Sequence, residues 1–158
     1  MMKYILNAMV NQLTSFPDLS YAKDTGYVAQ DPWDLVDKGN FPFFNVIPGD
    51  ERIVRGIDDM PKDQIERHIY PVTIQFAQSS MNLNVAIMGD VEKGIVGILD
   101  MSDNIWDAIN YDRTLGGVVE GIEPNDSEVS KDFLRAEDNM FLAQAEIMVE
   151  FYKDVALV

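Results

Sequence analysis

Residues 41–77 read FPFFNVIPGDERIVRGIDDMPKDQIERHIYPVTIQFA, and this stretch decides the fold. An apolar run is closed by Pro48–Asp50, a charged segment follows, and an alternating run ends the stretch. In that last run, large apolar side chains fall on every second residue: Val72, Ile74 and Phe76. A period of two predicts a strand with one buried face.

Prolines and charges set the limits of the first strand in this stretch. Phe41–Ile47 is apolar on both faces and is bracketed by Pro42 and Pro48. Both prolines lack the amide that a ladder needs, so we expect the strand to lie between them. Pro48–Asp50 then turns the chain, and we expect Glu51–Ile57 to extend as an arm.

A second strand follows a charged loop. We predict a polar loop over Asp58–Gln64 and a strand over Ile69–Gln78. Pro71 is awkward in a central strand because it cannot donate to a ladder, so we expect it at the strand start or in a register that faces an edge. Residues 80–90 fit either a strand end or a helix start.

The N-terminal residues predict a helix over residues 2–16. Its apolar residues recur at helical spacing: Leu6, Met9, Val10 and Leu13. A single stripe of this kind is typical of a surface helix. Phe16-Pro17 ends it, because the residue before proline avoids the α region.

Weaker signals lie between this helix and residue 41. Asp18–Gln30 lacks strong periodicity, so we predict an irregular segment with a short strand at Tyr27–Ala29. Asp31 followed by Pro32 is a helix-start signal and Gly39 is a stop. Together they give a short helix or turn over residues 32–38.

The strongest helical pattern begins at Asp90. This residue can cap a helix, and Glu92 suits the positive end of the helix dipole. Apolar residues then recur at helical spacing: Ile95, Ile98, Leu99, Met101, Ile105, Trp106 and Ile109. Acidic residues fall on the opposite side: Asp100, Asp103 and Asp107. We therefore predict an amphipathic helix of roughly five turns, with Gly116-Gly117 beyond its end.

The C-terminal part returns to strands. We predict a short strand over Val118–Glu123 and a turn-rich segment over Pro124–Asp132. Residues 140–153 then alternate, with one side made of Phe141, Ala143, Ala145, Ile147, Val149 and Phe151. The order helix, strands, helix, strands indicates one α+β domain over residues 1–158. We expect a mostly antiparallel sheet, with the N-terminal helix and the long central amphipathic helix packed on one face.

Charge is the strongest compositional feature. Twelve basic residues against 27 acidic ones give a net charge of −15. Such a surface repels phosphate, so it argues against general nucleic-acid binding through basic contacts. Three interpretations are open: solubility by self-repulsion, mimicry of DNA, or a wall past which DNA slides without adhering.

Other features of the sequence indicate the cellular compartment of the protein. The chain contains no cysteine, so it has neither a disulfide framework nor a thiolate zinc site. No apolar run approaches the roughly 18 residues that span a bilayer. Asn7, Asn11 and Gln12 interrupt any signal-peptide core near the N-terminus. We expect a protein that is cytoplasmic or assembled in the cytoplasm.

The residue types that carry chemistry give no catalytic pattern. His68 is the only histidine, and we expect it to be a surface or strand-end residue. Acidic pairs such as Asp58-Asp59 are expected by chance among 27 acids. A calcium loop from Asp100 fails, because Ile105 stands where glycine is required and Tyr111 where glutamate is. We therefore expect no enzyme activity, no metal and no cofactor.

Four stretches carry a resemblance to a known family: FPFFNVIPGDERIVR, RHIYPVTIQFA, KGIVGILDMSDNIWDAIN and the alternating C-terminal strand. With them the chain resembles the tail terminator proteins (tail-completion, minor tail protein U-like) of tailed bacteriophages. The likeness is in the order of elements over roughly residues 1–155.

The resemblance implies a virion protein that forms a hexameric ring on the last ring of the tail tube, at its head-proximal end. Such a ring stops tube polymerisation and offers a surface to the head-completion connector. Its implied partners are copies of itself, the tail tube protein and the head-completion or connector protein. DNA would pass through an acidic lumen without specific binding. By position and charge, we expect interface residues at Asp50, Glu51, Arg52 and Arg55.

Two other classes stay open. One is another head–tail joining protein, such as a neck or connector-completion component. The other is an acidic inhibitor that mimics DNA and occupies a DNA-binding enzyme, which needs carboxylates at phosphate-like spacing on one face.

Overall fold

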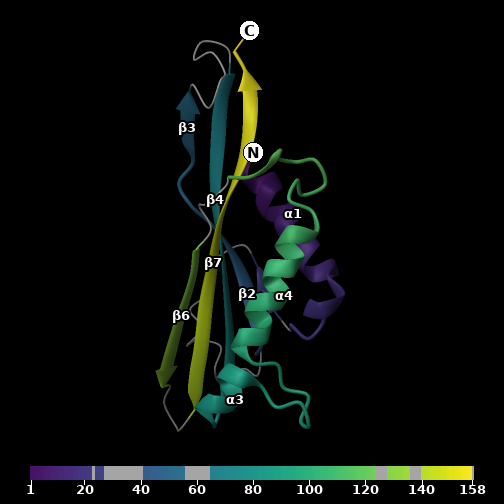
Figure 1. Ribbon diagram of the computed structural model, residues 1–158, viewed down its shortest axis with the longest axis vertical. Helices are drawn as coiled ribbons and strands as arrows, with labels where there is room; N and C mark the ends of the chain where they lie inside the picture. Colours follow the sequence, from purple (N-terminus) through teal and green to yellow (C-terminus); the bar gives the residue numbers. More distant parts are fainter. Residues whose placement is uncertain (23, 27–40, 56–64, 124–127, 136–139, 158) are drawn as a thin grey trace.

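The computed structural model describes residues 1–22, 24–26, 41–55, 65–123, 128–135 and 140–157. These residues form a seven-stranded sheet with helices on one side (Figure 1). The elements are α1 (Met2–Ser15), a 3-10 turn η1 (Pro17–Leu19), β1 (Asp24–Gly26), β2 (Phe43–Pro48), β3 (Arg52–Arg55), β4 (Ile65–Ser80), α3 (Leu83–Met88), α4 (Ile98–Tyr111), β5 (Gly121–Ile122), β6 (Glu128–Arg135) and β7 (Phe141–Ala156).

Two long antiparallel strands form the spine of the sheet. β4 and β7 pair along all 16 residues of each, from Ile65 opposite Ala156 to Ser80 opposite Phe141. At about 3.3 Å per residue this ladder is about 53 Å long. β2 and β3 follow one another along the outer side of β4, while β5 and β6 lie along the outer side of β7. β1 adds a parallel strand beyond β2.

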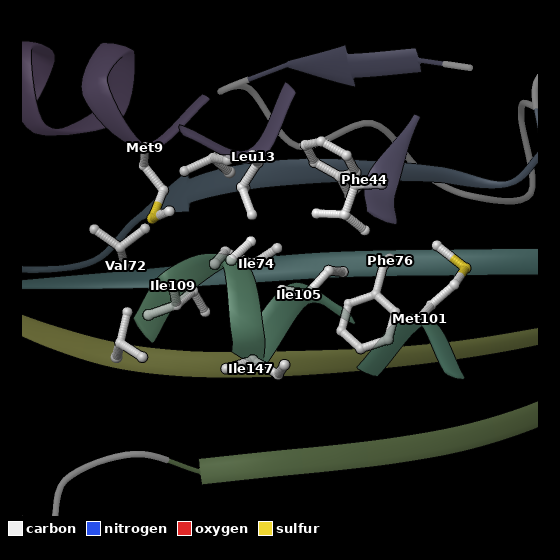
Figure 2. Close-up of a cluster of buried hydrophobic side chains, with 14 of the residues drawn as sticks. Met9, Leu13, Phe44, Val72, Ile74, Phe76, Met101, Ile105, Ile109 and Ile147 are labelled. Carbon is white, nitrogen blue, oxygen red and sulfur yellow. The ribbon is translucent and has the colours of Figure 1, made fainter. Parts of the chain in front are cut away.

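Alternation along the spine places one side of the sheet against the helices. The apolar residues of β4 that were predicted to share a face are fully buried, and so are their neighbours on β7 (Figure 2). The main residues of this sheet surface are Phe44, Val72, Ile74, Phe76, Ile147 and Val149. They pack against Met9 and Leu13 of α1 and against Met101, Ile105 and Ile109 of α4. The expected α+β fold with helices on one face is therefore confirmed.

Helix α1 follows the prediction closely. It runs over Met2–Ser15, with Ile5, Leu6, Met9 and Leu13 buried. Phe16 leaves the helix with φ −75° and ψ 119°, as the residue before proline should. The side-chain amide of Gln12 then donates to the carbonyl oxygens of Ala108 and Asp112, at 2.7 and 3.0 Å, at the end of α4.

The predicted start of the central helix at Asp90 is wrong. The Asp90 and Ile95 backbones exchange two hydrogen bonds of 2.9 Å, which close a tight turn. Helix α4 begins only at Ile98, with Gly97 as its N-cap, and spans 14 residues. Before the turn, Leu83–Met88 form the short helix α3, where the Asn82 side chain accepts from the Asn84 amide. Residues 80–90 therefore contain both a strand end and a helix.

Pro71 lies inside β4, so its expected place at the strand start is wrong. Its carbonyl oxygen accepts a hydrogen bond of 2.8 Å from the amide of Gly49. In an antiparallel ladder the N–H and C=O of one residue point to the same side. The proline nitrogen therefore faces the turn between β2 and β3, where the ladder is interrupted, and no amide is required there. The edge-facing alternative fits this arrangement.

The C-terminal strands are partly as predicted. β7 extends the predicted strand by three residues, and β5 lies within the segment predicted at 118–123. The turn predicted up to Asp132 is wrong over Glu128–Asp132, because β6 pairs there with β7. A long available ladder outweighs the weak strand propensity of the local sequence. The segments predicted at 27–29, 32–38 and 58–64 lie outside the described residues.

Candidate functional site

One end of the sheet extends past the helices as a three-stranded arm. We define the arm as β3, Ile65–Ile69 of β4 and Tyr152–Ala156 of β7, which pair in that order. Figure 1 shows it beyond the ends of α1 and α4. All four residues of β3 are exposed, including the apolar side chain of Ile53, at 57%, and that of Val54. Val155 on β7 is 39% exposed.

A tight turn joins the body of the sheet to the arm. Gly49 lies against Pro71 so closely that a Cβ at this position would be 2.9 Å from the proline Cβ. Glycine is therefore needed for the approach that allows the Gly49–Pro71 hydrogen bond. The predicted interface residues Asp50 and Glu51 follow in this turn with exposed side chains. Arg52 and Arg55 lie on β3 itself.

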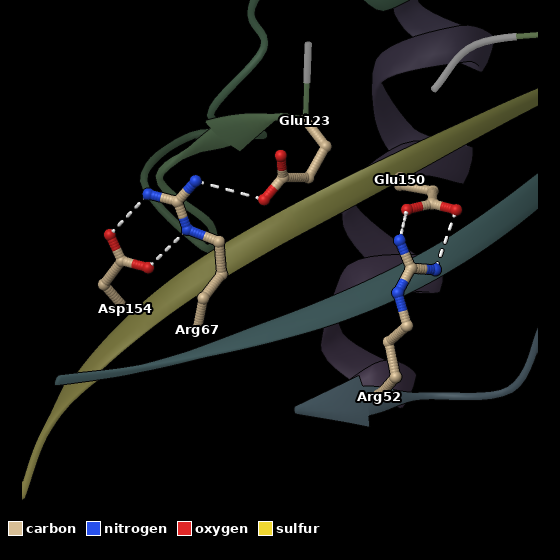
Figure 3. Close-up of polar contacts among 5 residues, drawn as sticks. All are labelled: Arg52, Arg67, Glu123, Glu150 and Asp154. Atoms are coloured by element: carbon tan, nitrogen blue, oxygen red, sulfur yellow. Dashed lines mark hydrogen bonds and ion pairs between the residues drawn. The ribbon is translucent and has the colours of Figure 1, made fainter. Parts of the chain in front are cut away.

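Arg52 reaches across β4 to a carboxylate on β7. Its two terminal nitrogens contact the two oxygens of Glu150, with Nη1 2.8 Å from Oε1 (Figure 3). A bidentate pair of this kind fixes direction as well as distance. The Arg52 side chain remains 46% exposed while that of Glu150 is buried. The pair therefore holds β3 to the spine.

Arg55 makes the second link between β3 and β4. Its Nε donates to Oε1 of Glu66 at 2.9 Å, and the His68 ring lies 3.3 Å from Oε2 of the same carboxylate. The hydrogen bond from Arg55, together with that from His68, holds the pKa of Glu66 below its usual range. Arg55 is 67% exposed, so this pair contributes little to stability. His68 lies near the start of β4, and this contact gives it a structural partner.

A third polar cluster of the arm centres on Arg67, which the sequence did not single out. Its guanidinium forms two hydrogen bonds to Asp154, at 2.7 and 2.9 Å, and one of 3.1 Å to Glu123 (Figure 3). It also stacks 4.0 Å from the ring centroid of Tyr152. These contacts hold the pKa of Asp154 below its usual range and raise that of Arg67.

The structure thus divides the four predicted residues into two pairs. Arg52 and Arg55 join β3 to the spine, while Asp50 and Glu51 occupy the turn that leads into the arm. From the sequence, the Arg67 cluster could have been suspected only from the opposite charges of Arg67 and Asp154. Their pairing depends on the register of two strands that are distant in the sequence.

A cavity of about 660 Å³ lies between the C-terminal ends of α1 and α4. Its polar side chains serve the fold, since Gln12 binds the end of α4. The Asp112 carboxylate accepts from the Thr114 hydroxyl at 2.6 Å and from the Gly116 amide at 2.8 Å. These bonds hold the pKa of Asp112 below its usual range. The arm is therefore the better candidate site.

The described residues show neither a metal site nor a membrane-spanning helix. No group of three or more histidine, aspartate or glutamate side chains in the described part of the chain could hold a metal ion. None of the helices described there has the length and apolar character that crossing a bilayer requires. Neither the models of protein families nor the curated proteins contain a match to this sequence.

Proposed function

We propose that this protein is a structural tail protein of a tailed bacteriophage. It forms a hexameric ring on the head-proximal end of the tail tube, ends polymerisation of the tube and provides the docking surface for the head connector. Its partners are copies of itself, the tail tube protein and the head-completion or connector protein. The proposal rests on the resemblance in the order of elements and on the geometry of the arm.

The single observation that carries the proposal is the uncovered arm. A three-stranded sheet without helices on it leaves apolar side chains such as Ile53 and Val155 in water. Exposed apolar residues on strands at a sheet edge are a liability for a protein that stays alone. Contacts with neighbouring subunits or with the tube would bury them.

The polar chemistry of the arm also suits assembly better than catalysis. Arg52 and Arg67 are engaged by carboxylates in bidentate geometry, and Arg67 also stacks on the Tyr152 ring, which orders surfaces and activates no nucleophile. A ring that ends a polymer needs defined surfaces and no bond-making step. The proposed function therefore includes no catalytic residue, metal or cofactor.

The negative charge gains a role in this proposal. A lumen rich in carboxylates would let DNA pass without adhering to the wall, because like charges repel. The sheet face away from the helices carries Glu146, Glu150 and Asp154. Arg52 and Arg67 neutralise part of that charge. Carboxylates paired in this way make a poor array of phosphate mimics, so a DNA-mimicking inhibitor is the weaker alternative.

The mass of the purified protein, followed by imaging with tail tubes, tests the proposal. Multi-angle light scattering would give the mass of the free protein against 17.9 kDa for one chain. Negative-stain images of the protein with purified tail tubes should show a six-fold ring at one end of each tube. Tubes assembled in its presence should also stop at a shorter length.

Three results would contradict the proposal. A protein that stays monomeric at high concentration and leaves tube ends bare is not a terminator. A compact monomer that blocks a nuclease would favour the DNA mimic instead. A ring that binds the connector but ignores the tube would point to another head–tail joining protein.

A further inference from the structure

The arm has two outer edges, and both carry backbone groups that face away from the sheet. On one side, β3 pairs with β4, and no other strand among the described residues lies beyond it. On the other side, the last residues of β7 extend past β5, which reaches only Tyr152. Such edges are templates for pairing with another chain.

The backbone hydrogen bonds of β4 decide which groups face outward. Because the C=O of Pro71 points to the β2 side, the odd-numbered residues of β4 bond to that side and the even-numbered ones to β7. Val54, opposite Arg67, therefore bonds inward, and Ile53 and Arg55 direct their N–H and C=O outward.

The same parity holds on the other edge. Lys153 and Val155 stand opposite His68 and Glu66, which bond to β7, so they face inward. Asp154 and Ala156 therefore direct their backbone groups outward. The bond from the Glu120 amide to the Tyr152 carbonyl oxygen, at 2.9 Å, is consistent with this alternation. Each edge thus offers two residues whose backbone donors and acceptors point away from the sheet.

We infer that these two edges bind each other in neighbouring copies of the chain. The outer edge of Ile53–Arg55 on one copy pairs with the outer edge of Asp154–Ala156 on the next, so the sheet continues from subunit to subunit. This inference rests on the proposed ring and names its subunit contact.

Strand directions fit a ring. β3 and β7 are both antiparallel to β4, so they run in the same direction within one copy. A rotation about an axis along the strands therefore brings β3 of one copy beside β7 of the next as a parallel pair. The contact is heterologous, with different surfaces on the two sides, and contacts of this type form a ring when the rotation between subunits closes.

Register and side chains fit the same pairing. With Val54 beside Asp154, the Asp154 amide can donate to Ile53, the Arg55 amide to Asp154 and the Ala156 amide to Arg55. This register keeps both sheet faces continuous, since Ile53 and Val155 share the helix side. Ile53 then lies beside Lys153 and Val155 beside Arg55, so the exposed apolar side chains of Ile53 and Val155 become diagonal neighbours on that side.

The presence of both edges on the same chain favours a second copy as the occupant. β3 carries two of the twelve basic residues and no acid, on a chain whose net charge is −15. Two identical molecules repel one another at long range because each is strongly negative, so a short basic strand at the contact lowers that repulsion. Arg55, with 67% of its side chain exposed, supplies part of this positive charge.

The absence of cysteine in the sequence makes a clean crosslinking test possible. Ile53→Cys and Val155→Cys proteins are purified separately, mixed in equal amounts and treated with a short bismaleimide, with and without tail tubes. The heterologous contact predicts a covalent dimer in the mixture and none in either protein alone. Val91→Cys, at a fully exposed site off the arm, is the matched control for random collisions.

Each other outcome counts against the inference. A dimer from Ile53→Cys alone would mean that β3 pairs with its own copy, and a dimer from Val155→Cys alone would mean the same for β7. Rings on tubes without a crosslink in the mixture would place the contact elsewhere while leaving the proposed function intact. Neither rings nor crosslinks would overturn both.

Discussion

Gly97 is the residue whose substitution tests the packing of the helical layer most directly. Its φ of −82° is open to any residue, so backbone strain plays no part. A Cβ at this position would overlap the Gly89 amide nitrogen and the Ile87 carbonyl oxygen, and it would lie 2.5 Å from the Met88 carbonyl carbon. All of these are backbone atoms at the end of α3, so no side-chain rotation can relieve the overlap.

The cost of Gly97→Ala follows from that geometry. Overpacking of this kind costs up to about 3 kcal/mol. Replacing glycine by alanine also restricts the unfolded chain, which raises the unfolding free energy by about 0.5 kcal/mol. The net loss of unfolding free energy should be about 2.5 kcal/mol, a fall in Tm of about 5–10 °C for a domain of this size.

Gly94→Ala is the matched control three residues away. Its φ is +67°, and a Cβ there meets nothing within 4 Å. The change therefore costs only about 1 kcal/mol, because alanine must adopt the left-handed conformation. Restriction of the unfolded chain offsets part of this cost, as it does at residue 97. Urea unfolding of both variants, followed by circular dichroism, compares the cost of the overlap at residue 97 with the cost of the left-handed conformation at residue 94. A Gly97→Ala protein as stable as Gly94→Ala would refute the close approach of α3 and α4.

Three further predictions concern hydrogen-bonded side chains. Arg67→Ala should lower the unfolding free energy by about 2 kcal/mol, because it leaves carboxylates without their charged donor, and Arg67→Lys should recover only part of this in thermal unfolding. The pKa of Asp154 is lowered in the fold, so its ionised form adds stability above its ordinary pKa of about 3.9, and this stability is lost as pH falls through the folded value. Asp154→Asn should therefore flatten the acid side of a plot of Tm against pH, and an unchanged slope would contradict that. Gln12→Ala should cost about 1 kcal/mol and speed amide exchange in the last turn of α4, whereas unchanged exchange would mean that the side chain does not hold that turn.

Patterns imposed by burial were predictable from the sequence. The alternation of Val72, Ile74 and Phe76, and that of residues 141–151, identified the buried face because a half-buried strand must repeat every two residues. The stripe of α1 and its end before Pro17 followed from equally local rules. These features make up the spine and the first layer of helix.

Features that depend on distant contacts were not predictable. The helical spacing of Ile95 with later residues concealed a turn, which is set by two backbone hydrogen bonds and by the fit of Gly97 against Gly89. β6 is a strand because β7 offers it a ladder, not because of its own residues.

The candidate site was also predictable only in part. Arg52 and Arg55 could be named from their place in an extended, charged segment after a turn. Their partners Glu150 and Glu66, and the whole Arg67 cluster, required the register of β4 against β7. Period two identifies the face of a residue but not its cross-strand neighbour.

The uninterrupted pairing of β4 with β7 has a mechanical consequence. Sixteen consecutive pairs run without a bulge from one tip of the molecule to the other. We expect each strand to restrain bending of the other, so that a force on the arm tilts the β4–β7 ladder as one body. A contact made at the arm would then move the opposite tip, beside α3, as well.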